Sequence, residues 1–193
     1  MSADAIKTVS EAIQKKLENA LKDAKPPISG SVHVGPLDDD NTETDAIVLF
    51  LYRIAINASL RNTEHRVPAN KAGDPPVVFR DSTPLDLYYL LTAGTSETGG
   101  EPEALRTLGY AIRALNDEPD LVGIAAGGET VRLSIDPVST EELSRIWTLF
   151  PTANYRTSVV YLASPVWIDP PIERAVAPAV RSEAYRSPPP RAA

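Results

Sequence analysis

Residues 155–168, YRTSVVYLASPVWI, carry the clearest indication of how the chain folds. Side chains along a β-strand alternate between two faces. One face would carry Tyr155, Thr157, Val159, Tyr161 and Ala163, and the other Ser158, Val160 and Leu162. Because both faces are apolar or β-branched, the pattern predicts a strand covered on both sides, either central in a sheet or at an edge that a partner chain covers. None of its side chains is typical of catalysis, which favours a scaffold or docking surface.

A second strand is predicted over Ala46–Asn57, AIVLFLYRIAIN. Strict alternation places Ile47, Leu49, Leu51 and Ala55 on one face, and Val48, Phe50, Tyr52, Ile54 and Ile56 on the other. Two apolar faces again predict a covered, central strand. Arg53 is the exception, so we expect it to find a partner or to lie near an end of the sheet. Shorter strands are expected at 32–34, 84–93 and 130–135.

Three amphipathic helices are indicated by apolar residues at three- and four-residue steps. The first runs over 4–24, with Ile6, Val9, Ile13, Leu17 and Leu21 on its apolar face. The second runs over about 102–117, with Leu105, Leu108, Ile112 and Leu115. Ser139 and Glu142 have capping-box spacing and start the third, whose apolar face ends in Trp147 and Phe150. We interpret Trp147 as a core residue, with an interface role as the alternative. The fold class is α+β.

Two segments interrupt this pattern. Residues 59–83 are polar and rich in loop-forming residues, with Val77-Val78-Phe79 as the apolar patch, and we expect an excursion that orders against a neighbour. Isolated His33 and His65 lack companions at ligand spacing, so surface or structural roles are expected. After Pro170-Pro171 the composition becomes rich in Ala, Pro and Arg. We therefore expect one domain over 1–171 and a flexible or extended arm over 172–193.

Composition and motifs argue against several classes of protein. The net charge is −7, and no dense Lys/Arg cluster offers the basic patch of a nucleic-acid binder. The chain contains no cysteine, hence no disulfide or thiolate metal site. No apolar run approaches the roughly 20 residues of a membrane span. The N-terminus lacks the apolar core of a secretory signal, so a cytoplasmic origin is expected.

No catalytic motif was found, and neither a metal nor a cofactor is expected. Asp38, Asp40 and Thr42 match EF-hand positions one, three and five, but Glu43 replaces the glycine and Leu49 the bidentate glutamate. A solvated acidic loop is the better interpretation. A hydrolase using a pair such as Asp38 and Asp40 stays open as a lesser alternative, since paired acids are recognised by geometry.

Four segments in order, IVLFLYRIAINASLRN, PLDLYYLLTA, LGYAIRALNDEPDL and PVSTEELSRIWTLF…YRTSVVYLASPVWIDP, resemble the DUF4255 family. This is the N-terminal domain of the cap, or tail terminator, of extracellular contractile injection systems such as the antifeeding prophage and Photorhabdus virulence cassettes. The likeness covers roughly Val9 to Pro170. It implies a mixed, mainly antiparallel sheet flanked by helices, as in phage tail terminators. Each segment is a structural rather than a catalytic signature.

The resemblance further implies a non-enzymatic ring, expected to be a homohexamer, at the distal end of the inner tube and sheath. Partners would be other copies of the chain, the tube protein and the sheath protein, with no nucleic acid and no membrane insertion. The protein would assemble in the bacterial cytoplasm and then form part of the particle. The candidate interface residues are Arg53, Arg61, Arg66, Val77, Val78, Phe79, Trp147, Tyr161, Trp167, Ile172 and Arg174. A non-catalytic adaptor of another assembly is the alternative.

Overall fold

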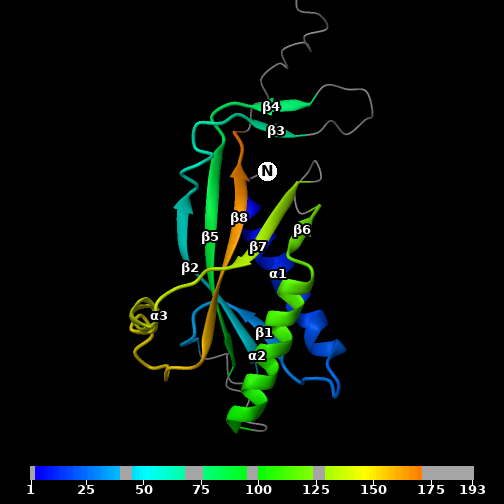
Figure 1. Ribbon diagram of the computed structural model, residues 1–193, viewed down its shortest axis with the longest axis vertical. Coiled ribbons are helices and arrows are strands. Elements are labelled where there is room, and N and C mark those ends of the chain that lie inside the picture. The colour runs from blue at the N-terminus through cyan, green and yellow to red at the C-terminus, as the bar shows by residue number, and fades with distance from the viewer. Residues whose placement is uncertain (1–2, 40–44, 68–75, 95–99, 124–128, 171–193) are drawn as a thin grey trace, which may run out of the picture.

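The structure is a computed structural model that describes residues 3–39, 45–67, 76–94, 100–123 and 129–170. Within these ranges the elements are α1 (Ala5–Asp23), β1 (Ser31–Val34), β2 (Asp45–Ile56), β3 (His65–Val67), β4 (Val77–Phe79), β5 (Thr83–Ala93), α2 (Gly100–Asp117), β6 (Asp120–Val122), β7 (Thr130–Ile135), α3 (Thr140–Trp147) and β8 (Ser158–Ile168). The expected α+β class and mixed, mostly antiparallel sheet are confirmed (Figure 1).

Six strands form one curled sheet in the order β1-β2-β5-β8-β7-β6. Only β1 and β2 run parallel; β5, β8, β7 and β6 follow in antiparallel succession. The strand β8 lies between β5 and β7, so the central position predicted from its two apolar faces is confirmed. The long helices α1 and α2 cover one face of the sheet, here called the α1 face, and α3 lies against the other, the α3 face (Figure 1).

The larger core lies on the α1 face. The stripe of α1 predicted from sequence is buried there, with Val9, Ile13, Leu17 and Leu21 at most 2% exposed. It packs on alternate residues of the central strands, such as Tyr89 of β5 and Tyr161 of β8. Burial raises the pKa of both phenols to about 12. The alternation predicted for 84–93 therefore holds, and that predicted for 155–163 holds from Ser158, where β8 begins. It is wrong for Tyr155, which precedes the strand and packs on Trp147 rather than lying on the face of Tyr161.

The smaller core holds α3 against the opposite face. Ser139 Oγ accepts a hydrogen bond from the Glu142 backbone N–H at 3.1 Å, which is the expected N-cap. The helix then presents Ile146 and Trp147 to the sheet residues Val48, Leu90 and Val160. This short helix depends on packing rather than on its own length for stability.

The strict alternation expected along β2 is wrong beyond Leu51. Leu51 is opposite Tyr89, but Arg53 is opposite Tyr88, so β2 contains one extra residue at Tyr52. Such a bulge shifts the side chains that follow to the opposite face. Ile54 is therefore paired with Leu87 on the α1 face rather than lying on the face predicted for it.

The excursion over 59–83 builds a second, two-stranded sheet from β3 and β4. It lies beyond the end of the main sheet where β2 and β8 finish and β5 starts (Figure 1). The excursion is ordered against the chain's own elements here, since the buried ring of His65 stacks on Trp167 of β8 with centroids 4.4 Å apart. Contact with a neighbouring molecule, as expected from sequence, stays a prediction.

Candidate interaction surfaces

The second half of β2 is an open sheet edge. The four-residue strand β1 pairs with β2 only from Asp45 to Leu49, so residues 50–56 have no strand on that side within the described ranges. Ile54 and Ile56 are 49% and 60% exposed there. The central position predicted for β2 is thus correct for Asp45–Leu49, which lies between β1 and β5, and wrong for residues 50–56. An open edge with exposed aliphatic side chains is a template for pairing with another strand.

Arg53 lies on the same open edge, as the sequence led us to expect for a charge in an apolar strand. Its guanidinium is exposed and stands over the Tyr88 ring on the α3 face, 4.8 Å from the centroid. The cation–π contact orients Arg53 without removing it from solvent. The edge therefore combines two isoleucines on one face with one positive charge on the other.

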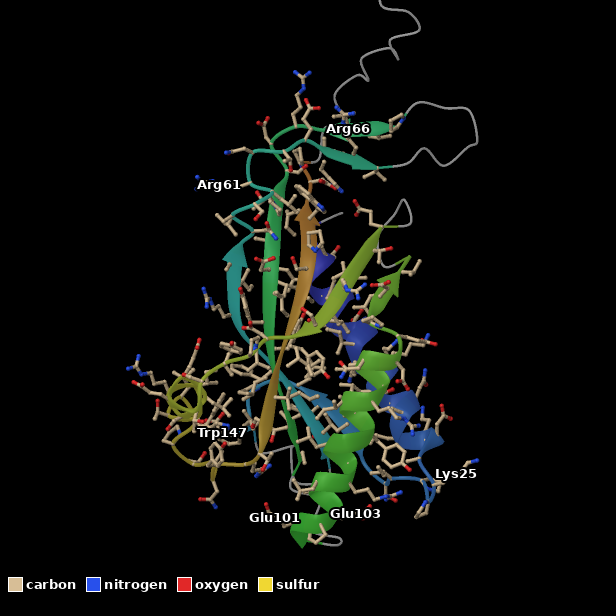
Figure 2. All side chains as sticks on the ribbon, viewed as in Figure 1. Lys25, Arg61, Arg66, Glu101, Glu103 and Trp147 are labelled. Atoms are coloured by element: carbon tan, nitrogen blue, oxygen red, sulfur yellow. The ribbon has the colours of Figure 1, made fainter. Side chains whose placement is uncertain are left out.

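The two ends of the molecule are built from different elements. Arg61 and Arg66 are exposed at the end that carries β3 and β4, and Glu101 and Glu103 lie at the opposite end, where α2 begins (Figure 2). Arg66 contacts Glu64 at 3.3 Å, and both side chains are largely solvated. Exposed ion pairs of this kind contribute little to stability. Both arginines remain accessible to a partner.

A buried histidine fixes the position of the β3–β4 sheet. His65 is 4% exposed and lies between the carboxylates of Asp169 and Glu129. Its Nδ1 is 2.7 Å from Asp169 Oδ1, which also accepts a hydrogen bond from Ser82 at 2.7 Å. The expectation of a structural histidine is confirmed. The group joins β3, the residue before β7 and the residue after β8, so three segments distant in sequence hold one another in place.

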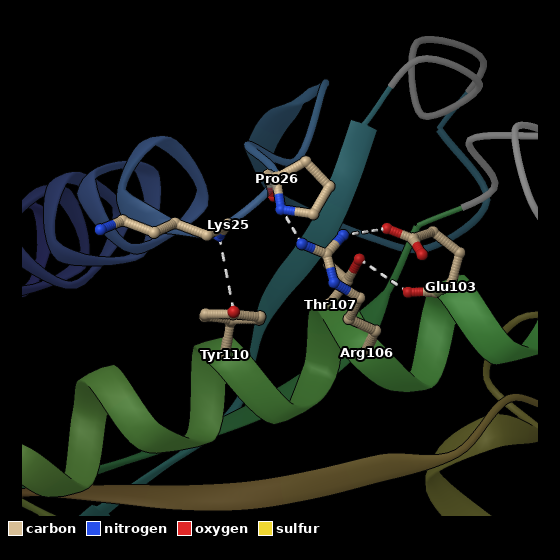
Figure 3. A network of polar contacts seen from close by, with 6 residues as sticks. All are labelled: Lys25, Pro26, Glu103, Arg106, Thr107 and Tyr110. Carbon is tan, nitrogen blue, oxygen red and sulfur yellow. Dashed lines mark hydrogen bonds and ion pairs between the residues drawn. The ribbon is translucent and has the colours of Figure 1, made fainter.

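At the opposite end, polar contacts tie the turn after α1 to α2 (Figure 3). Arg106 donates to the Pro26 carbonyl and to Glu103. The Tyr110 hydroxyl accepts from the Lys25 backbone N–H at 3.5 Å, and the guanidinium of Arg106 lies 5.3 Å from the Tyr110 ring centroid. These contacts fix the packing of the two helices, and none of them has the arrangement of a catalytic group.

The structure places the other predicted interface residues as follows. Trp147, Tyr161 and Trp167 are 6%, 1% and 8% exposed, so all three lie in the chain's own core and none is presented to a partner. The core interpretation of Trp147 is thereby supported over its interface alternative. The residues of the Val77–Phe79 patch form β4 and are half-buried. Ile172, Arg174 and the proposed arm lie outside the described residues, as does Asp40 of the acidic loop.

Reasoning from sequence missed two features of these surfaces. The open edge could have been suspected because a predicted strand of three residues cannot cover a neighbour of twelve. The partners of His65 carried no local signal, since Asp169 lies 104 residues away. Among the described residues no group of three or more His, Cys, Asp or Glu side chains could hold a metal ion. No helix in the same ranges is long and apolar enough to cross a membrane.

These observations define an α+β domain with helices on both faces of a curled sheet, an open sheet edge and two structurally different ends. The chain belongs to the family described as the Pvc16 N-terminal domain, whose model matches residues 8–182. The family resemblance inferred from sequence is confirmed at this level, and the match continues past the domain boundary expected at 171. No curated protein matches the chain.

Two solved structures share the fold. One is the sheath/tube terminator of an extracellular contractile injection system (PVC) in the extended state, with 21% identity and a TM-score of 0.61. That similarity covers 94% of this chain and 65% of the other. The second is the tube-terminating cap of the anti-feeding prophage, with 21% identity, a TM-score of 0.60, and coverage of 93% and 60%. The chain thus spans less than two thirds of the length of either protein.

Proposed function

We propose that the protein is a structural cap, or tail terminator, of a phage-tail-like contractile injection system. The observation that carries this proposal is the fold shared with a sheath/tube terminator and with a tube-terminating cap over 94% and 93% of the chain. Membership of the Pvc16 N-terminal domain family supports it independently. The role is architectural rather than catalytic: the protein ends tube polymerisation and holds the last sheath layer.

The proposed partners are other copies of the chain in a ring, expected to be a hexamer, together with the inner tube protein and the sheath protein. The cap would join the particle during assembly in the bacterial cytoplasm and leave with it. A terminator needs one surface that matches the last tube ring and no equivalent surface that templates another ring. The two ends of the chain fit this requirement, because one carries the β3–β4 sheet and the other the start of α2, and two different surfaces do not bind the same target equally well (Figure 1).

We assign the tube contact to the end that carries Arg61 and Arg66, together with the exposed parts of Val77-Val78-Phe79. These are basic and apolar groups on an acidic protein, and both arginines are solvent-accessible. Exposed charges at the periphery of an interface affect the rate and specificity of association more than its final affinity. Ile172 and Arg174, just after β8, are assigned to the same contact from their place in the sequence.

Electron microscopy of the N-terminally labelled protein mixed with purified inner tube tests the proposal. We expect a closed ring at one end of each tube, whose subunit number is read directly. The variant Arg61→Glu/Arg66→Glu should bind tube ends more weakly, with a smaller dependence on salt. Arg145→Glu is the matched control, because this arginine is 78% exposed on the distant helix α3. A monomer that ignores tube ends would refute the cap role and favour an adaptor of another assembly.

A further inference from the structure

Within the described residues the six-stranded sheet has two unpaired edge segments, and they lie on opposite sides of the molecule (Figure 1). One edge is the free part of β2, residues 50–56, and the other is β6. On β6, Val122 is 71% exposed. In Figure 1 the free part of β2 and the strand β6 stand at similar heights along the long axis. A ring built by rotation needs two different, complementary surfaces placed in this way.

The backbone of β2 presents N–H and C=O groups at this edge that no strand of the described residues pairs with. The Asn57 N–H donates to the Pro84 carbonyl of β5 at 2.9 Å, so the backbone groups of Asn57 point towards β5. Because N–H and C=O groups of successive residues in a strand point alternately to the two sides, Ile54 and Ile56 direct theirs outward. The same reasoning applies to β6. Leu133 donates to the Pro119 carbonyl at 2.8 Å, so Asp120 and Val122 direct their backbone groups away from β7.

The two strands run in the same direction. Each antiparallel pair reverses the strand direction. Four such pairs, β2–β5, β5–β8, β8–β7 and β7–β6, separate β2 from β6, so the two strands point the same way. A rotation about an axis along the strands keeps that direction, so β2 of one copy would meet β6 of the next as a parallel pair. In a parallel ladder, one residue bonds to the two neighbours of the residue opposite it. Ile54 would then bond to Asp120 and Val122 while lying opposite Leu121.

The side chains agree with this register. Ile54 lies on the α1 face through its pairing with Leu87, and Leu121 packs in the core of that same face. Arg53 would stand opposite Asp120 on the α3 face, where Asp120 already contacts Arg132 at 3.3 Å. Opposite charges across neighbouring strands stabilise a pairing, and like charges oppose it. Apolar groups meet on one face and a positive charge meets a negative one on the other.

We propose that the occupant of the open β2 edge is β6 of a second copy of this chain, paired in parallel with Ile54 opposite Leu121 and Arg53 opposite Asp120. This inference rests on the proposed ring and specifies its subunit contact. Closure of the ring removes the free sheet edge from every subunit at once, as it does in a barrel. Loops and helices beside the two strands would supply the remaining contact area.

A disulfide cross-link tests this contact, and the chain has no cysteine of its own to interfere. Opposite residues on adjacent strands are about 5 Å apart at Cα, within the range of a disulfide. Rings of the Arg53→Cys/Asp120→Cys variant should give, on mild oxidation, a covalent ladder up to the full subunit number in non-reducing electrophoresis. The control Arg53→Cys/Arg145→Cys places the second thiol on α3 and should give no ladder.

A charge exchange supplies an independent measurement. Arg53→Asp and Asp120→Arg should each weaken every subunit contact about two- to five-fold, an effect that multiplies around a ring. The variant that carries both exchanges, Arg53→Asp and Asp120→Arg, should restore assembly. If either single variant failed to assemble because it was misfolded, the second exchange would not restore assembly. Rings that form in the unmodified protein but neither cross-link nor respond to the exchange would overturn this contact and leave the cap role intact. Absence of any ring, alone or at tube ends, would refute the proposed function itself.

Discussion

Truncation of Trp147 to alanine should strongly destabilise the folded chain. The indole is 6% exposed and packs against Phe150 and Tyr155, with ring centroids 6.3 and 5.4 Å away. Its Nε1–H donates to Ser158 Oγ at 3.2 Å, which ties α3 to the start of β8. The eight-residue helix has few other anchors in the sheet.

The size of the expected stability loss follows from the contacts that the Trp147→Ala substitution removes. A buried tryptophan replaced by alanine reduces the free energy of unfolding by about 3–5 kcal/mol, since the packing of the whole ring is lost and a cavity remains. The hydroxyl of Ser158 still donates to the Arg156 carbonyl at 2.8 Å, so no additional buried donor is left unpaired. For a chain of this length each kcal/mol lowers Tm by about 2–4 °C. The expected decrease in Tm is therefore about 6–20 °C.

Urea unfolding followed by far-UV circular dichroism measures this loss without relying on tryptophan fluorescence. Trp147→Phe keeps most of the ring and should lose about 1 kcal/mol with the hydrogen bond. The matched control is Leu149→Ala, since Leu149 is 61% exposed and should change the stability by no more than about 0.5 kcal/mol. If Trp147→Ala leaves the unfolding free energy within 1 kcal/mol (roughly the hydrogen bond alone) but abolishes binding to a partner, the side chain acts at an interface and the core argument is wrong.

Three further perturbations address the rest of the fold. The pKa values of Tyr89 and Tyr161 are raised to about 12 by burial, against about 10 in an unfolded chain. The stability that these raised pKa values contribute is complete below pH ~10 and is lost as the pH rises towards 12. The urea midpoint should therefore fall across that interval, and it should fall less in the Tyr89→Phe/Tyr161→Phe variant. His65→Ala removes the buried ring that contacts the Asp169 and Glu129 carboxylates and stacks on Trp167, and should lower the unfolding free energy by about 1–3 kcal/mol, measured by the same titration; unchanged stability would contradict the structural role. Gly94→Ala places a Cβ 1.9 Å from the Asp45 carbonyl oxygen, so the strand must move, and a loss of about 1–3 kcal/mol is expected in thermal unfolding.

Local periodicity was enough to predict the helices and the central strands. The stripe from Val9 to Leu21 and the alternation in 84–93 both follow from side-chain spacing along one element. The helix N-cap at Ser139 could also be predicted from sequence, because a capping box is a contact between residues three apart. Each of these predictions depends on neighbours in sequence, and each matches the structure.

The features that were missed depend on residues far apart in the chain. The bulge at Tyr52 arises from pairing with β5, more than thirty positions away, and no local pattern marks it. The open edge depends on the length of β1 relative to β2. The burial of Tyr161 and Trp167 depends on α2 and β3 as neighbours, so their aromatic character alone could not separate core from interface.

The bulge at Tyr52 determines where β2 can change in length. Leu51 lies opposite Tyr89 and Arg53 opposite Tyr88, so loss of Tyr52 alone would leave a regular ladder with every later residue of β2 on its present face. If the bulge is kept, loss of one residue beyond Arg53 would instead move the residues that follow it to the opposite face. We therefore expect relatives to tolerate a one-residue change in length at the bulge itself, and other length changes in the loops on either side of β2.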